Sequence, residues 1–453
     1  MENVIFMKNK IYVLTPGNVV TGGVELLHQL SYKLNLLGFS SCIVYCNKQG
    51  EPAVYNTPEI YEKYNSVVSE AVEDNENSIV VFPEVFLYKL SEIKKAKRVL
   101  WWLSVDNAAG YEDDFTYAFA DKSILHFSQS EYSTQYLIKN GVEKNRIYWL
   151  SDYINSEFLH IDKTIIDKDN IVVFNPRKGI EKTLELIRNS YGNIKWIALS
   201  GFTPVGMRDI LQKAKVYIDF GNHPGRDRIP REATYCGCCL ITNQEGSANN
   251  NIDIPIDEKY KISTETDTMD VLRLIHSVLD NYQIEVNNIS EYRKRTAEEF
   301  MRFEIDILSV FGEVLGCEIS DDTTEEIQKN KIISCFVAGD LPGAYYEMIK
   351  YRYLKFEEDS IYNKIEANIR IEIGEYNEAE YVISKELEKD INNPEIYLIL
   401  AKIHLNMRTA ESVKECISDC LKVMELASGT QNENTYYDIA NQYVIMAKQM
   451  LKI

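Results

Sequence analysis

The first third of the chain alternates between short apolar segments and amphipathic segments. Residues 10–16 are apolar and rich in β-branched side chains, which favours a strand. The amphipathic segment that follows ends at Gly38 and carries leucines at helical spacing, namely Leu26, Leu27, Leu30, Leu34 and Leu37. The same pattern predicts further strands at Ser40–Cys46, Ser78–Phe86, Lys97–Asn107, Ile124–Ser130 and Arg146–Asp152, and helices at Glu59–Val72 and Ser133–Asn140. Nearly continuous apolar strands between helices indicate a parallel sheet that is covered on both faces.

A second set of alternating strands and helices begins near Asn170. Strands are predicted at NIVVFNP, IKWIALS, KVYIDFG and CLITNQ, a short helix runs from near Pro230 to Gly237, and two long helices extend to Leu315. The predicted fold class is therefore α/β, with two tandem Rossmann-like, doubly wound domains at residues 1–155 and 156–290. Ligands of open α/β sheets bind beyond the carboxyl ends of the strands, so two such domains would enclose a cleft.

Beyond a polar, acidic linker at residues 318–326, the pattern of residues 327–453 is entirely helical. The segment AGDLPGA at 338–344 recurs 35 residues later as IGEYNEA, and a weaker copy, MRTAESV, begins at Met407. A period near 34 is that of paired-helix repeats. The region resembles tetratricopeptide (TPR) repeats, although Arg408 stands where glycine is usual, and an unrelated helical bundle is the alternative. Because such repeats form concave surfaces, we expect the region to bind a protein partner or to position an acceptor.

Composition excludes several classes of protein. The 453 residues suffice for two to four domains, and the net charge of −20 argues against a nucleic-acid partner. We recognise no signal peptide, and no apolar window approaches the ~18 residues of a membrane span. We therefore expect a cytoplasmic protein without a transmembrane segment, at most peripheral at the inner face of a membrane.

The cysteines favour a reducing compartment. Their number, nine, is odd, and they are scattered except for Cys236, Cys238 and Cys239. A zinc site at these three residues would lack a second pair of ligands at suitable spacing. We interpret them as small buried side chains.

A cluster of cations between Gly221 and Glu232 is unusual in so acidic a chain. Arg226, Arg228 and Arg231 lie within six positions, close to His223, between a predicted strand and a predicted helix. A helix N-terminus attracts anions, and guanidinium groups bind phosphate in a bidentate manner. Glu232, in the first helical turn, could accept hydrogen bonds from a ribose diol. The alternative is that the arginines are solvated or pair with carboxylates.

Two further segments follow strands of the same domain. Arg177 and Lys178 come after one strand, and Gly246 and Ser247 come after another, where small residues allow backbone N–H groups to approach a phosphate. We expect these three strand ends to be adjacent and to converge on one anion. In the first domain, Gly22 and Gly23 precede a helix and would face the same cleft, although the G-x-G-x-x-G spacing of the dinucleotide fingerprint is absent.

Four segments resemble those of GT-B glycosyltransferases, the group of two Rossmann-like domains that includes glycogen synthase and the large fourth family of retaining transferases. They are TPGNVVTGGVELLHQL, IYWLSDYINSEF, RKG and PREATYCGCCLIT, and the resemblance extends from about Lys10 to Leu315. It implies that Lys178 binds the diphosphate, that Glu232 binds the ribose and that residues 291–317 form a helix that crosses back to the first domain. It also implies that the configuration of the transferred sugar is retained.

The sequence departs from the family at three positions. Pro224 occupies the position of a frequent second glutamate, Val173 that of a usual arginine, and SVDN offers Asp106 where a histidine is typical. An inverting reaction would need a general base in the first domain, for which Asp106 is the candidate, unless it only forms a turn with Asn107. The candidate catalytic residues are thus Asp106 and Glu232.

These features together predict a glycosyltransferase that moves a sugar from a nucleotide-diphosphate sugar to a hydroxyl group. The acceptor would be a saccharide, a lipid-linked sugar or a protein, and the resemblance implies bacterial surface polysaccharide or glycoconjugate synthesis. Since cations and backbone amides would stabilise the leaving diphosphate, no metal and no cofactor beyond the co-substrate is expected. The alternatives are a nucleotide-sugar epimerase on the same fold and a non-catalytic adaptor that presents the repeats.

Overall fold

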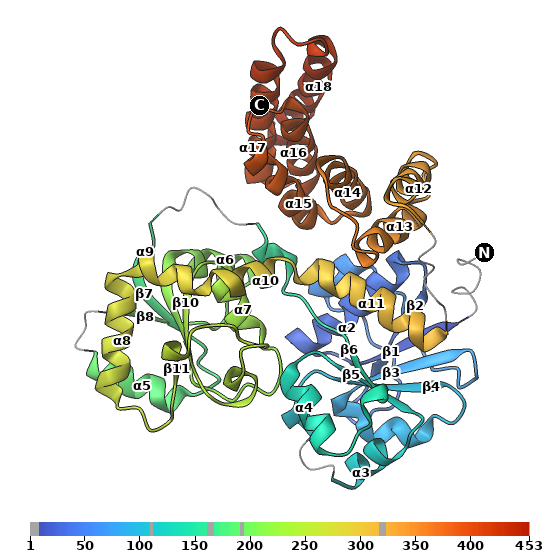
Figure 1. Cartoon of the computed structure of the whole chain (residues 1–453), viewed down its shortest axis with the longest axis vertical. Coiled ribbons are helices and arrows are strands. Elements are labelled where there is room, and N and C mark those ends of the chain that lie inside the picture. Colours follow the sequence, from blue (N-terminus) through green and yellow to red (C-terminus); the bar gives the residue numbers. More distant parts are fainter. Residues whose placement is uncertain (1–8, 109–111, 161–166, 191–193, 317–322, 453) are drawn as a thin grey trace. The chain divides into compact units, whose positions relative to one another are not determined.

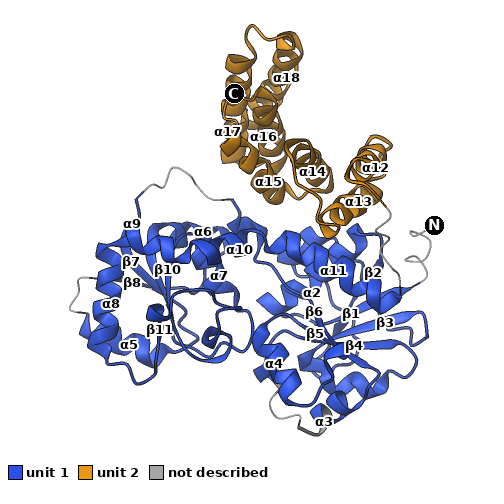
Figure 2. Cartoon of the chain, in the orientation of Figure 1, with its two compact units in different colours: residues 1–319 blue, residues 320–453 orange. Residues whose placement is uncertain are grey.

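The computed structural model describes residues 9–108, 112–160, 167–190, 194–316 and 323–452. The chain divides into two compact units, residues 1–319 and residues 320–453 (Figure 2). Most of the predicted linker at 318–326 lies outside the described residues. The first unit contains two sheets, and we call the six-stranded sheet with its helices the first half and the five-stranded sheet with its helices the second half.

The sheet of the first half is parallel throughout, with strand order β2-β1-β3-β4-β5-β6 (Figure 1). Its strands are β1 (Lys10–Pro16), β2 (Ser40–Cys46), β3 (Ser78–Pro83), β4 (Lys97–Trp102), β5 (Ile124–Ser128) and β6 (Ile147–Trp149). Trp101 and Trp102 are fully buried in its core. The predicted parallel sheet is confirmed.

The sheet of the second half is also parallel, with strand order β11-β10-β9-β7-β8. Its strands are β7 (Asp169–Phe174), β8 (Lys195–Ala198), β9 (Ala214–Asp219), β10 (Cys239–Asn243) and β11 (Lys261–Ile262). Because β10, β9 and β7 are neighbours, the three loops that follow them lie at one edge of the sheet. This adjacency is the one expected from the sequence.

Helices surround both sheets. Those of the first unit are α2 (Gly22–Leu36), α3 (Glu112–Ala120), α4 (Glu131–Lys139), α5 (Ile180–Asn189), α6 (Pro204–Lys213), α7 (Arg228–Tyr235), α8 (Thr268–Asp280), α9 (Tyr282–Glu285), α10 (Ser290–Ala297) and α11 (Glu299–Leu315). The helix predicted to begin near Pro230 begins at Arg228, with the proline in its first turn.

Four predicted strands of the first half are too long. β5 ends at Ser128 instead of Ser130 and β6 at Trp149 instead of Asp152, and in the other two cases a 3₁₀ helix follows the strand. β3 ends at Pro83 instead of Phe86, and β4 ends at Trp102 instead of Asn107; the 3₁₀ helices η2 (Glu84–Glu92) and η3 (Val105–Ala108) follow. The apolar pattern continues past the edge of the sheet because Phe86 and Leu87, on η2, pack into the same core as the strands. This shortening places Glu84 at the carboxyl end of β3.

The helix predicted over Glu59–Val72 is wrong beyond its first turns. The structure has only the 3₁₀ helix η1 (Glu59–Tyr64), which ends at Asn65 in a left-handed conformation with φ of 42°. The chain then extends beside β2, where the Ile43 N–H donates to the Val67 carbonyl at 2.8 Å and the Ser69 N–H donates to the Ile43 carbonyl at 2.9 Å. These hydrogen bonds to the edge strand compete with helix formation.

The helix α11 connects the second half to the first (Figure 1). It packs against α2 and β6. Lys33 of α2 and Glu304 of α11 form a fully buried ion pair at 2.6 Å, and the Ser151 N–H donates to Asp306 at 3.0 Å. Helix α11 therefore brings the C-terminal end of the first unit back to the sheet of the first half.

The second unit contains only helices in its described part. They are α12 (Glu325–Val337), α13 (Leu341–Tyr353), α14 (Ser360–Ile373), α15 (Tyr376–Lys389), α16 (Pro394–Met407), α17 (Ala410–Ala427) and α18 (Glu433–Leu451). The turns within the pairs α12–α13, α14–α15 and α16–α17 contain Gly339, Gly374 and Arg408, each with a left-handed φ, of 77°, 86° and 58°. The repeated segments thus occupy equivalent turns, and Arg408 adopts the conformation for which glycine is usual.

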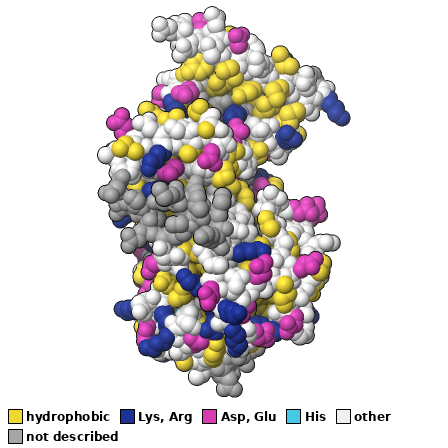
Figure 3. Space-filling view, turned by 90° about the vertical axis from the view of Figure 1, so that its right-hand side faces the viewer, with side chains coloured by type: hydrophobic (Ala, Val, Ile, Leu, Met, Phe, Trp, Pro, Cys, Tyr) yellow, Lys and Arg dark blue, Asp and Glu magenta, His cyan; other side chains and the backbone are white. Residues whose placement is uncertain are grey.

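The surface of the helical unit is rich in apolar side chains. On the face in Figure 3 they gather over this unit, whereas acidic and basic side chains are mixed over the lower part of the view. Val337, Leu421 and Ile445 are among those exposed. A binding role for the unit stays a prediction.

Two absences hold for the described part of the chain. No helix in it has the length and apolar character that crossing a membrane requires. Within the same ranges, no three His, Cys, Asp or Glu side chains group so that they could hold a metal ion.

We predict that Arg408→Gly stabilises the helical unit, because glycine adopts a left-handed φ without steric cost. The free energy of unfolding of this unit, measured in the full chain, should rise by up to about 1 kcal/mol. Gly374→Ala, at the equivalent turn with open space around the glycine, should lower it by about 1 kcal/mol for the converse reason. Urea unfolding followed by circular dichroism measures both, and a loss of stability in Arg408→Gly would contradict the turn assignment.

Candidate functional site

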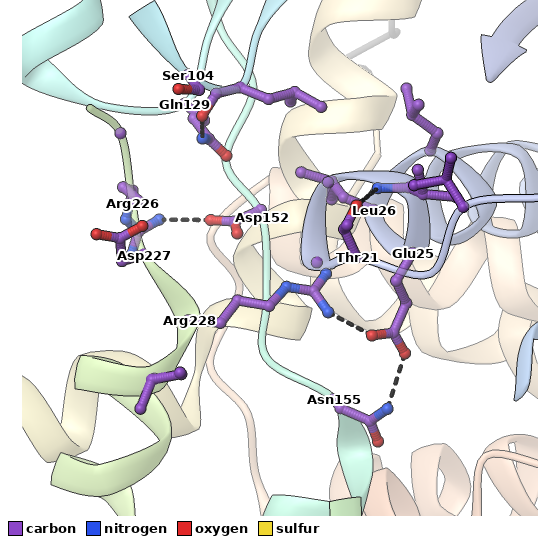
Figure 4. A pocket seen from close by; sticks show the side chains of 18 of the residues that line it. Thr21, Glu25, Leu26, Ser104, Gln129, Asp152, Asn155, Arg226, Asp227 and Arg228 are labelled. Atoms are coloured by element: carbon purple, nitrogen blue, oxygen red, sulfur yellow. Dashed lines mark hydrogen bonds and ion pairs between the residues drawn. The ribbon is translucent and has the colours of Figure 1, made fainter. Parts of the chain in front are cut away.

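A cavity of about 850 Å³ lies between the two halves, at the carboxyl ends of their strands (Figure 4). Its first-half wall comes from α2 and from the loops after β1, β3, β4 and β5. Its second-half wall comes from α6, the loops after β7 and β9 and the start of α7, and the segment that joins the halves also contributes. The volume is typical of a small-molecule site. The predicted site residues that line it are Gly22, Gly23, Lys178, Arg226, Arg228 and Glu232.

Arg228, at the start of α7, forms an ion pair across the cavity with Glu25 of α2 (Figure 4). One guanidinium nitrogen lies 2.5 Å from a Glu25 carboxylate oxygen, and the other donates to the Gln29 side chain at 2.8 Å. Glu25 also accepts hydrogen bonds from Asn155 at 2.7 Å and from Tyr64 at 2.6 Å. Burial alone would raise the pKa of Glu25, but the neighbouring Arg228 and Lys63 lower it.

Arg226 and Arg231 both bind the carboxylates of Asp152 and Glu299. Arg231 contacts Asp152 at 2.5 Å and Glu299 at 2.7 Å, and Arg226 contacts them at 3.4 Å and 2.5 Å. Arg231 is fully buried and is not part of the cavity wall. Burial opposes ionisation of Asp152, but the two guanidinium groups outweigh it and lower the pKa of that carboxyl.

The arginine cluster is therefore paired with buried carboxylates, which is the alternative that the sequence left open. The carboxylates come from α2, from the segment that joins the halves and from α11, and all are distant in sequence from α7. Of the three arginines, Arg226 and Arg228 still present part of their surface to the cavity.

Glu232 lies on α7, lines the cavity and is only 7% exposed. Burial and the nearby Glu25 raise the pKa of Glu232 to about 7, although Arg228 acts in the opposite direction. A carboxyl group in this state can accept or donate hydrogen bonds near neutral pH.

Lys178 reaches the cavity from the loop after β7. Its ammonium group lies 2.6 Å from Asp227 and donates to the Asn222 carbonyl at 3.1 Å. Asp227 also contacts His223 Nδ1 at 3.0 Å, while His223 Nε2 lies 3.0 Å from Thr242. Burial lowers and the Asp227 contact raises the pKa of His223, with a net rise. His223 is fully buried behind the cavity wall.

Three other predicted residues of the second half lie outside the wall. Arg177 is exposed, and its backbone N–H donates to Asn175 at 3.0 Å. Gly246 has φ of 57°, and the Ser247 N–H and hydroxyl donate to the carbonyls of His223 at 2.8 Å and Gly225 at 2.7 Å. Gly246 and Ser247 therefore brace the loop between β9 and α7, residues 220–227, which we call the arginine loop. The Ser247 amide expected to contact a phosphate already has a partner.

The arginine loop contacts the first half directly. The Val105 N–H donates to the Pro224 carbonyl at 2.9 Å. Elsewhere, the backbone N–H groups of Glu131 and Tyr132, at the start of α4, donate to Asp253 at 2.8 Å and 3.0 Å. These bonds join the two halves at two further places.

Asp106 does not line the cavity. It is exposed, and its carboxylate accepts a hydrogen bond from Asn222. Besides Glu25 of α2, the carboxyl group that lines the first-half wall is Glu84, which the sequence interpretation missed because it assigned residues 78–86 to one strand. The available signal was an acidic residue directly after an apolar, proline-ended run.

No family model matches the sequence, and no curated protein sequence matches it. In structure the chain is similar to Anabaena Alr3699/HepE, solved in complex with UDP and glucose, with 11% identity, a TM-score of 0.51 and coverage of 68% of this chain and 99% of that chain. It is also similar to sucrose-phosphate synthase from Thermosynechococcus elongatus, with 9% identity, a TM-score of 0.50 and the same coverage. These similarities confirm the predicted GT-B fold of two Rossmann-like domains.

We predict that Arg231→Met lowers the free energy of unfolding by about 3–5 kcal/mol, since it leaves Asp152 and Glu299 buried without a full set of partners. Arg188→Met, at an exposed position of α5, is the control and should change it by less than about 0.5 kcal/mol. Urea unfolding measures both. Equal stability of the two variants would show that the ion pairs do not hold the halves together.

A second prediction concerns pH. With a pKa of about 7, Glu232 in the folded chain keeps a proton that the unfolded chain releases near the ordinary value of 4.5. The unfolded state then binds fewer protons in this interval, so the stability of the folded state falls as pH rises from about 4.5 to 7.

The variant Glu232→Gln lacks this ionisation. As pH rises from 5 to 7, the wild type should therefore lose unfolding free energy relative to Glu232→Gln. The difference between the two proteins should level off above pH 7, within about one pH unit. Urea unfolding at successive pH values tests this, with exposed Glu181→Gln as the control. A constant difference across the range would contradict the assigned environment of Glu232.

Proposed function

We propose that the protein is a glycosyltransferase that moves a sugar from a nucleoside diphosphate sugar to a hydroxyl acceptor. The observation that carries this proposal is the cavity at the carboxyl ends of both sheets of a GT-B fold, lined by Lys178 and Glu232 on one wall. Anabaena HepE, which is similar in structure, was solved with UDP-glucose, so uridine diphosphate sugars are the first donors to test.

Lys178 would bind the diphosphate. Its side chain is 29% exposed and is held by Asp227, so a phosphate can replace a carboxylate as its partner at little geometric cost. The N-terminus of α7 lies on the same wall and adds the partial positive charge of its backbone N–H groups, whereas Arg226 and Arg228 beside it are paired with carboxylates. As negative charge develops on the leaving diphosphate, these preorganised groups would stabilise it without a metal ion.

Glu232 would accept hydrogen bonds from the ribose diol, as the family resemblance implies. Retention of configuration is likewise part of the proposal. The inverting alternative depended on Asp106, which is exposed and lies outside the wall of the cavity. A cytoplasmic role in surface polysaccharide or glycoconjugate synthesis completes the proposal and rests on the resemblance.

The predicted result is that UDP-glucose or a related nucleotide sugar raises the melting temperature of the wild type, because a ligand of the folded state stabilises it. Lys178→Ala and Glu232→Gln should each raise the Kd about tenfold or more, since each removes a charge-assisted contact. Lys195→Ala, at an exposed position on β8, is the matched control and should bind like the wild type. Full affinity in both site variants would contradict the assignment.

Turnover separates the remaining alternatives. A glycosyltransferase needs an acceptor to form product, whereas an epimerase converts the nucleotide sugar alone. Incubation of the wild type with donor, with and without a saccharide mixture, followed by chromatography of nucleotides and sugars, distinguishes the two. Failure to bind any nucleotide sugar would overturn the proposal in favour of a non-catalytic adaptor.

A further inference from the structure

Four polar residues lie together on the first-half wall of the cavity, whereas Lys178 lies on the second-half wall. Glu84 follows β3, Ser104 and Asn107 follow β4, and Gln129 follows β5, and all four line the cavity. β3, β4 and β5 are neighbours in the sheet, so their carboxyl ends bring these loops to one place. Figure 4 shows Ser104 and Gln129 side by side on this wall.

Glu84 is a buried carboxyl group that pairs with no lysine or arginine among the described residues. It is 2% exposed, and its oxygens accept hydrogen bonds from the Leu103 N–H at 3.1 Å and the Asn107 side chain at 2.9 Å. Burial raises the pKa of Glu84 to about 7, although these two bonds and the backbone N–H groups of Glu84 and Ser104 act in the opposite direction. A buried carboxyl without a cation opposes folding, so its place on a cavity wall calls for a role in ligand binding.

Gln129 offers an unused hydrogen-bond acceptor. It is 3% exposed, and its Nε2 donates to the Leu103 carbonyl at 2.5 Å. Its Oε1 has no hydrogen-bond partner in the part of the chain that the structure describes. The amide cannot be reversed, because that would set two acceptor oxygens against each other. Oε1 is therefore an acceptor held ready for a donor from outside the chain.

Apart from the Ser104 hydroxyl, which can donate or accept, the hydrogen-bonding capacity that remains on this wall is that of acceptors. The donors nearest to it already have partners: the Leu103 N–H and the Asn107 amide bind Glu84, the Gln129 amide binds Leu103, and the Val105 N–H binds Pro224. A phosphate or carboxylate would find only the Ser104 hydroxyl as a side-chain donor without a partner among the described residues, and it would face the Glu84 carboxyl group. A hydroxyl group, which donates a hydrogen bond, satisfies both Glu84 and Gln129.

We propose that Glu84 and Gln129 form a subsite that accepts hydrogen bonds from the hydroxyl groups of a neutral sugar. The proposal rests on the proposed function only for where that sugar comes from, which is either the donor's sugar moiety or a free saccharide acceptor. The wall thus complements the opposite one, where cations face the cavity: the second half selects an anion and the first half selects hydroxyl groups.

Isothermal titration of the full chain with UDP, with UDP-glucose and with glucose in the presence of UDP tests the subsite. Gln129→Met removes the unused acceptor while keeping the volume, and Gln135→Met, at an exposed position of α4, is the matched control. We expect Gln129→Met to raise the Kd for UDP-glucose or for glucose about tenfold, with UDP affinity unchanged. The melting temperature should fall modestly, because the variant also removes the hydrogen bond to the Leu103 carbonyl. Loss with UDP-glucose identifies the donor's sugar as the ligand, and loss with glucose alone identifies an acceptor.

A second variant, Glu84→Gln, guards against an effect on folding. It keeps the shape of the side chain and should weaken the same sugar ligand as Gln129→Met, again without a change in UDP affinity. Unchanged sugar binding in both variants, or an equal loss of UDP and UDP-glucose, would overturn the subsite. If the wild type binds glucose but no nucleotide, the proposed function fails while the subsite stands, so the two failures are distinguishable.

Discussion

The cavity depends on buried ion pairs that join α7 to the first half. The cations are Arg226, Arg228 and Arg231, and the anions are Glu25, Asp152 and Glu299. Each charge lost its hydration on folding, and only close pairing offsets that cost. Since the carboxylates lie on α2, on the joining segment and on α11, the pairs fix the two halves and the start of α7 in one arrangement.

This arrangement explains why an acidic chain concentrates arginines at one loop. The cations neutralise carboxylates that would otherwise be buried unpaired, and they hold the arginine loop against the first half. Lys178, by contrast, is partly exposed and pairs with Asp227, so it can exchange a carboxylate for a phosphate. Lys178, which we propose to bind the diphosphate, and the arginines, which join the two halves, are thus different residues of one cluster.

The two walls of the cavity differ in chemistry because the strands behind them end in different loops. On the second half, the loops after β9 and β7 carry cations, which suits an anion. On the first half, the ends of β3, β4 and β5 present Glu84 and Gln129 as acceptors, which suits hydroxyl groups. A nucleotide sugar and its acceptor need both kinds of wall.

The sequence by itself determined the alternation of strands and helices, the strand ends that meet after β10, β9 and β7, and the left-handed turns of the helical unit. These follow from local periodicity and from turn residues, which act within a few positions. Only the tertiary structure decided which carboxylate each arginine binds, since Arg228 and Glu25 are 203 positions apart. It also revealed Glu84 and Gln129, because the edge of a sheet and an unpaired acceptor exist only once distant segments are packed together.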